Sequence, residues 1–114
     1  MPLFRSVENT VVQVWRRTGD SAGGDAARRL VHRDLGAFFA PADRQRRSFE
    51  GRVVYVTGLL LLPDRDAAGV QVDVMAGDLL KFTDYRGELR EAEAVQVRAV
   101  HALGYLDHIE VEVA

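Results

Sequence analysis

Three histidines, His32, His101 and His108, are the residues of this chain best suited to bind a metal or to act as an imidazole base. His101 and His108 flank a short turn, so a hairpin could bring them together with Asp107 or Glu110 as a further ligand. The alternative places His108 on a solvent-exposed strand face beside these two acids. We favour the alternative, because the spacing of the histidines is a weak indication of a metal site. We therefore expect neither a metal nor a cofactor.

Pairs of carboxylates two residues apart are the second candidate for chemistry, since such a pair shares one face of a strand. The pairs are Asp64 with Asp66, Glu91 with Glu93, and Glu110 with Glu112. General acid–base catalysis needs one desolvated carboxyl group beside a solvated one, and nothing in the sequence indicates such burial. The chain also has no G-x-S-x-G motif and no glycine-rich phosphate loop. We therefore expect a protein that is not an enzyme.

A cluster of arginines is the third candidate. It comprises Arg44, Arg46, Arg47 and Arg52, and it is flanked by Phe38, Phe39 and Phe49. Arginine binds phosphate and aromatic rings stack on bases, so the cluster could bind nucleic acid. A solvated basic loop is the simpler interpretation, because the net charge of the whole chain is −2. A third interpretation is a basic loop that points into the lumen of a ring and meets DNA only weakly.

Composition limits the class of protein. The chain has 114 residues, 47% of them hydrophobic and 28% charged, which favours one soluble globular domain over residues 1–114. It has no cysteine, so disulfides, thiol nucleophiles and cysteine-bound metals are excluded. We find no secretion signal and no apolar stretch long enough to cross a membrane, and we expect a soluble, unsecreted protein without membrane contact. Trp15 is expected to anchor the core or an interface.

Charge is distributed unevenly along the chain. Residues 28–52 contain seven arginines and three acids, whereas residues 53–114 contain five basic and eleven acidic residues. The basic middle thus carries +4 and the acidic end −6. Such patches would allow one copy of the chain to meet the next through unlike faces.

Hydrophobic patterning predicts an all-β fold of six to seven short strands, in a small antiparallel barrel or sandwich. Residues 1–8 are expected to be an extended or flexible terminus, and residues 36–51 a long loop, because Pro41 and the arginines interrupt the apolar pattern. The predicted strands are 9–15, 30–35, 52–62, 70–74, 79–83, 94–100 and 106–113. Residues 70–114 are expected to form a small meander, with Gly87 at positive φ in a tight turn.

The second half of the chain resembles the head-closure, or stopper, proteins of the head-to-tail connector in tailed bacteriophages and gene-transfer particles. The resemblance lies in three segments. Thr57–Asp64 is an apolar strand that ends in a Pro-Asp turn, Val70–Asp78 is an alternating segment that ends in a Gly-Asp turn, and Leu106–Val111 is a terminal strand that bears a histidine. The match covers residues 52–114 and extends poorly into the first fifty.

This resemblance implies a β-barrel subunit that assembles into a ring of six or twelve copies. The ring would lie in the virion, after assembly in the host cytoplasm, between an upstream adaptor or portal ring and the downstream tail proteins, and it would seal or gate the DNA channel. By position, residues 36–51 would be the channel loop, with Arg44, Arg46 and Arg47 near the DNA. Interface candidates are Trp15, Phe38, Phe39, Asp107 and Glu110. Two alternatives remain open: a nucleic-acid-binding barrel of the OB or SH3 type, and a tail-terminator component of the same particle.

Overall fold

The computed structural model describes residues 8–18, 28–47, 51–84 and 86–114, and every regular element in this part of the chain is a strand. The strands are β1 (Thr10–Arg17), β2 (Arg28–Arg47), β3 (Val53–Pro63), β4 (Leu79–Thr83), β5 (Leu89–Ala102) and β6 (Tyr105–Val113). All neighbouring pairs are antiparallel. The predicted all-β fold is confirmed. Among these residues, no helix is long and apolar enough to cross a membrane.

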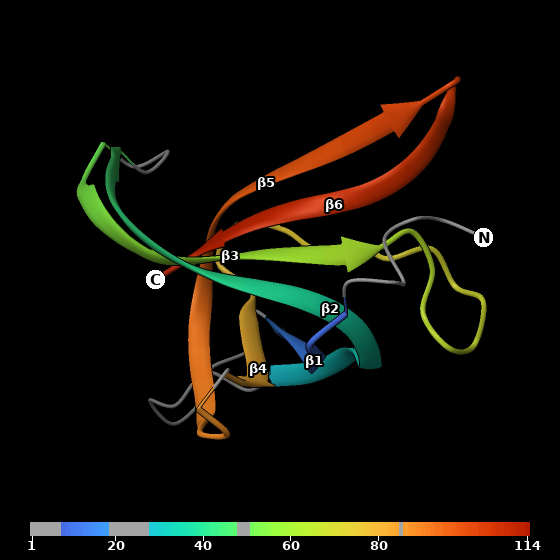
Figure 1. The fold of residues 1–114 in the computed structure, drawn as a ribbon, viewed down its shortest axis with the longest axis horizontal. Coiled ribbons are helices and arrows are strands. Elements are labelled where there is room, and N and C mark those ends of the chain that lie inside the picture. The colour runs from blue at the N-terminus through green and yellow to red at the C-terminus, as the bar shows by residue number, and fades with distance from the viewer. Residues whose placement is uncertain (1–7, 19–27, 48–50, 85) are drawn as a thin grey trace.

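The sheet closes on itself in the order β1-β2-β3-β6-β5-β4, as a barrel. Two meanders, β1-β2-β3 and β4-β5-β6, are joined by the segment 64–78, and the barrel closes where β1 pairs with β4 (Figure 1). The second meander corresponds to the one predicted over residues 70–114, but it begins at Leu79. Its first turn has Gly87 at φ 81°, a conformation that glycine adopts without strain.

The predicted loop over residues 36–51 is wrong, because β2 continues as a strand of 20 residues to Arg47. Its first half pairs with β1 and its second half, from Phe38, pairs with β3. The register shifts between Pro41 and Arg44, so the residues that suggested a loop form an irregularity within the ladder. Bulges of this kind tolerate proline and bend a strand without ending it.

The predicted strand 70–74 is also wrong, although its alternation does indicate which side chains are buried. Val72 and Val74 are in the core and Val70 is exposed. The backbone here forms only an isolated bridge, between Gln71 and Arg65. The segment is therefore a loop that inserts two valines into the barrel.

Aliphatic and aromatic side chains from all six strands fill the barrel. Phe39 and Phe82 are in contact at its centre, with 4.9 Å between ring centroids. Gly58 lies against the ring of Phe39, which occupies the space that a Cβ atom would need. The remaining core residues are Val12, Val14, Leu35, Ala37, Leu60, Leu62, Val72, Val74, Leu80, Ala92, Ala94, Ile109, Val111 and Val113.

Arg90 lies over the aromatic pair in the core. Its guanidinium carbon is 5.3 Å from the ring centroid of Phe39 and 5.7 Å from that of Phe82. The same group donates a hydrogen bond of 3.1 Å to the hydroxyl of Thr57. Arg90 thus links β5 to β3 at a point where these two strands are not paired, and cation–π contact favours its place over the rings.

Candidate functional site

The turn between β5 and β6 has an unusual residue at its tip. Leu103 and Gly104 form the two-residue connection, with φ angles of 54° and 82°. Hairpins with two residues at positive φ strongly favour Asn-Gly, Asp-Gly or Gly-Gly, and a leucine in this conformation is strained. Leu103 is also 98% exposed. The side chain therefore contributes little packing to the folded subunit. A smaller residue would suit this turn conformation better.

Other exposed apolar side chains lie beside this turn and at the start of β3. Tyr105, next to the tip, is 79% exposed. Val53 and Tyr55, on β3, are 61% and 57% exposed. They belong to the β2–β3 hairpin, which extends toward the opposite end of the longest axis from the β5–β6 hairpin (Figure 1). Each location presents a tyrosine with an aliphatic neighbour, the type of residue that is enriched in the centre of protein interfaces.

The arginines predicted to lie near DNA are at the distal end of the β2–β3 hairpin, whose described part we call the β2–β3 tip (residues 43–47 and 51–57). Arg44 and Arg47 are exposed there, and the side chain of Arg46 lies outside the described part of the chain. Arg47 donates to the backbone oxygen of Gly51, at 3.1 Å, and so helps to close the turn. The arginines thus lie on a hairpin that extends beyond the β3–β6 pairing, and not on a long loop.

The side chain of Arg44 contacts the acidic end of its own chain. Its Nε lies 3.4 Å from Oε2 of Glu112, which is nearly buried on β6. On the same face, Arg98 donates to Glu110 at 2.8 Å. Part of the basic middle and part of the acidic end therefore neutralise each other within one subunit.

The aromatic residues predicted for an interface lie in different environments. Phe39 is in the core, so its side chain is not available to a partner. Phe38 is half-buried on the outer face, opposite Leu61 of β3. Trp15 is half-buried on β1, where its Nε1 donates to Gln13 and Lys81 lies 4.9 Å from the ring centroid. Phe49 lies outside the described residues.

Asp107 and Glu110 both contact the ring of His108. Nδ1 of His108 is 2.7 Å from Oδ2 of Asp107, and Nε2 is 3.4 Å from Oε1 of Glu110. The two acids thus lie beside His108 as expected, but the histidine is half-buried and not on a solvent-exposed face. Within the described ranges, no group of three or more histidine, aspartate or glutamate residues could hold a metal ion.

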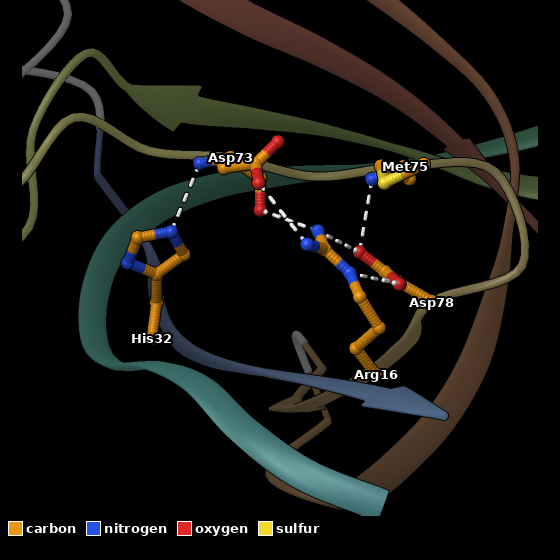
Figure 2. Close-up of polar contacts among 5 residues, drawn as sticks. All are labelled: Arg16, His32, Asp73, Met75 and Asp78. Atoms are coloured by element: carbon orange, nitrogen blue, oxygen red, sulfur yellow. Dashed lines mark hydrogen bonds and ion pairs between the residues drawn. The ribbon is translucent and has the colours of Figure 1, made fainter. Parts of the chain in front are cut away.

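A polar cluster that includes the buried His32 and Asp78 holds the segment 64–78 against the barrel (Figure 2). Arg16 on β1 donates to both carboxylate oxygens of Asp78, over 3.1 and 2.9 Å, and to the side chain and backbone oxygen of Asp73. The hydrogen bond to Asp78 is the main cause that raises the pKa of Arg16, so the arginine stays charged. Asp78 also accepts from the backbone N–H of Met75. Arg16 thus fixes the segment to β1 at two points, Asp73 and Asp78.

His32 on β2 forms the other half of this cluster. Its Nε2 accepts from the backbone N–H of Asp73 and its Nδ1 contacts Oδ2 of Asp66, each over 2.9 Å. The first bond requires an unprotonated Nε2, so the proton of the neutral ring is on Nδ1 and is donated to Asp66. A histidine with both nitrogens engaged and 3% exposure has no free position for a substrate. The histidine–aspartate pair is therefore a structural clamp.

The sequence did not predict this cluster, because its members are 34 to 62 residues apart. One signal was present, since Asp78 follows Gly77 in a turn and aspartate commonly accepts backbone N–H bonds there. Nothing in the local pattern indicates that Arg16 and His32 point toward that turn. Comparison of the chain with protein-family models, with curated proteins and with solved structures finds no match.

Proposed function

We propose that this protein is a structural subunit that assembles with copies of itself into a ring, and that this ring is the head-closure component of a head-to-tail connector. The observation that carries the proposal is the strained and fully exposed Leu103 at the β5–β6 turn. A bulky apolar residue at positive φ is a cost to the isolated subunit, and burial against another chain would offset that cost.

The position of the exposed apolar groups supports a ring in particular. The exposed Leu103 and Tyr105 belong to the β5–β6 hairpin and the exposed Val53 and Tyr55 to the β2–β3 hairpin. These two hairpins extend toward opposite ends of the longest axis (Figure 1). Contacts between unlike surfaces of identical chains produce closed rings or open filaments, whereas contacts between like surfaces produce dimers. Two different apolar surfaces on one subunit are therefore what a ring requires.

The resemblance of residues 52–114 to head-closure proteins supports a place for the ring in a head-to-tail connector. The basic residues of the β2–β3 tip suit this role, because arginines on an extended hairpin could approach DNA in the lumen without binding it tightly. Residues 36–47 belong to β2. The channel element in this proposal is therefore the β2–β3 tip, and not a loop over residues 36–51.

The experiment is to measure the mass of the purified chain by light scattering over a range of concentrations and to image it by electron microscopy. We expect closed rings, alone or after addition of the adjoining connector protein from the same particle. A chain that stays monomeric under both conditions would contradict the proposal. A monomer whose affinity for DNA falls steeply with salt would instead support the nucleic-acid-binding barrel.

A further inference from the structure

Two strands have backbone edges that no other described strand covers. β3 pairs with β6 from Gly58 to Pro63. Its residues 53–56 pair with β2 alone, and Thr57 is in neither of these two ladders. β5 pairs with β4 from Leu89 to Glu93, whereas from Gln96 to Ala102 it pairs only with β6. We call these segments the β3 edge (residues 53–57) and the β5 edge (residues 96–102).

The β3 edge lacks the features that usually protect an open strand. Its sequence, Val-Val-Tyr-Val-Thr, contains no charge and no proline, and all five residues have high β propensity. Soluble proteins protect such edges with charged side chains, prolines or bulges, because an open edge pairs readily with another strand. The β3 edge is therefore well suited to accept a strand.

The space beside the β3 edge is a groove of about 480 Å³. Val53–Tyr55 line one wall, and Glu93–Val95 with Ala114 line another. A strand of five residues is about 16 Å long, comparable to the length of the edge that it would cover. The groove thus leaves room for an added strand next to β3.

A second open edge on the same chain indicates what covers the β3 edge. From Gln96 to Ala102, β5 has no described strand on the side away from β6. The β5–β6 hairpin and the β2–β3 hairpin extend toward opposite ends of the subunit (Figure 1). One copy can therefore offer its β5 edge to the β3 edge of the next, and contacts between such unlike surfaces are the type that builds a ring.

We propose that the β5 edge of one copy pairs with the β3 edge of the next, so that neighbouring barrels share a continuous hydrogen-bonded sheet. This inference rests on the proposed ring and names the contact that builds it. The same contact brings the exposed Tyr55 of one subunit toward the β5–β6 hairpin of its neighbour.

Crosslinking between introduced cysteines tests this pairing. The native chain has no cysteine, so no other residue of that type can react. Tyr55→Cys and Val100→Cys variants would be assembled separately and as a mixture, then treated with a short bis-maleimide, which tolerates small differences in register. We expect a two-chain product in the mixture and little product from either variant alone. A product from Tyr55→Cys alone would show β3 paired with β3, and would overturn the inference.

The outcomes separate this inference from the proposed ring. Rings that give no mixed crosslink would overturn the strand pairing and leave the ring intact. Mixed crosslinks in open filaments would support the pairing and contradict the ring. A chain that neither assembles nor crosslinks would contradict both.

A second variant tests the edge by blocking it. Tyr55→Lys places a charge on the β3 edge, and we expect it to weaken association by about tenfold or more. Leu89→Lys is the matched control, because Leu89 is 75% exposed and lies on neither edge. Equal thermal midpoints for the two variants would show that both fold. Equal association would overturn the inference.

Discussion

The backbone N–H of Asp73 donates to Nε2 of His32 across 2.9 Å, which joins the segment between β3 and β4 to the barrel through a side chain 41 residues away. This bond and the neighbouring His32–Asp66 contact lie within the barrel wall, where water cannot replace a lost partner easily. The loop is therefore held in place by specific polar contacts as well as by its two buried valines.

Removal of the imidazole should loosen this segment. His32→Phe preserves most of the volume but removes the imidazole contacts of the Asp73 N–H and of Oδ2 of Asp66. We expect a loss of about 1–3 kcal/mol in the free energy of unfolding. Urea denaturation measures the loss. Arg33→Ala, at the exposed neighbouring position, should change stability by no more than about 0.5 kcal/mol. Similar values for both variants would mean that the clamp contributes nothing.

The ion pair between Arg16 and Asp78 should contribute more than that between Arg16 and Asp73. Asp78 has a side-chain exposure of 4% and Asp73 one of 65%. Asp78→Ala leaves a largely buried guanidinium without its main partner, which should cost about 3 kcal/mol. Asp73→Ala should cost less than about 1 kcal/mol, because solvent screens that pair. Thermal or urea unfolding of both variants provides the comparison, and equal losses would contradict this ranking.

Acid should weaken the clamp through Asp66. The hydrogen bond from His32, followed by that from the backbone N–H of Val70, lowers the pKa of Asp66 from its ordinary value of 3.8. A carboxyl group with a lowered pKa in the folded state contributes stability above its unfolded pKa and loses it as the pH falls through the folded pKa. The stability difference between wild type and Asp66→Asn should thus be constant near neutrality and shrink below about pH 4. Urea unfolding over that range measures it, and a constant difference would refute the assignment.

Gly58 should not tolerate a side chain. A Cβ atom there would overlap the ring of Phe39, so Gly58→Ala should destabilise the protein by about 1–3 kcal/mol. Phe39→Leu in the same chain should recover part of this loss relative to the sum of the single variants. Gly36→Ala is the control, because only the carboxylate end of Glu8 lies close to its Cβ position. Strictly additive effects at positions 58 and 39 would argue against the overlap.

Substitution of Leu103 should have opposite effects on the stability of the subunit and on its assembly. Leu103→Asn relieves the strain of a bulky residue at φ 54° and should raise the free energy of unfolding by about 1 kcal/mol. The same variant removes the apolar group at the turn, so ring formation should weaken. Calorimetry and light scattering on one preparation test both effects. A variant that is more stable and assembles normally would remove the main support for the proposed function.

The all-β class and the second meander could be predicted from sequence because their signals are local. The alternation in 106–113 and the Gly87 turn need no knowledge of distant residues. The length of β2 could not be predicted in this way. Pro41, with the two residues that follow it, has the composition of a turn, and only its pairing with Gly58 of β3 shows that the strand continues.

The candidate site was predicted less well than the fold, for a similar reason. Arg44 and Arg47 are exposed, but the partner of Arg44 is Glu112, 68 positions further along the chain. The sequence predicted that Phe39 lies at the surface beside the arginines. Its ring is instead in the core, and the bulge in β2 separates it from the exposed arginines. The strain at Leu103 could not be predicted from sequence, because a leucine does not indicate a turn residue at positive φ.

Arg90 and the aromatic rings beneath it lie within a barrel whose interior is filled by side chains. Nothing the size of a DNA strand could pass through such a subunit. In the proposed ring, the passage must therefore run between subunits, around the symmetry axis, and its diameter would depend on how many copies close the circle. The bore would then be a property of the subunit contacts, so a substitution that changes the angle between neighbours could widen or narrow it while every barrel stays intact.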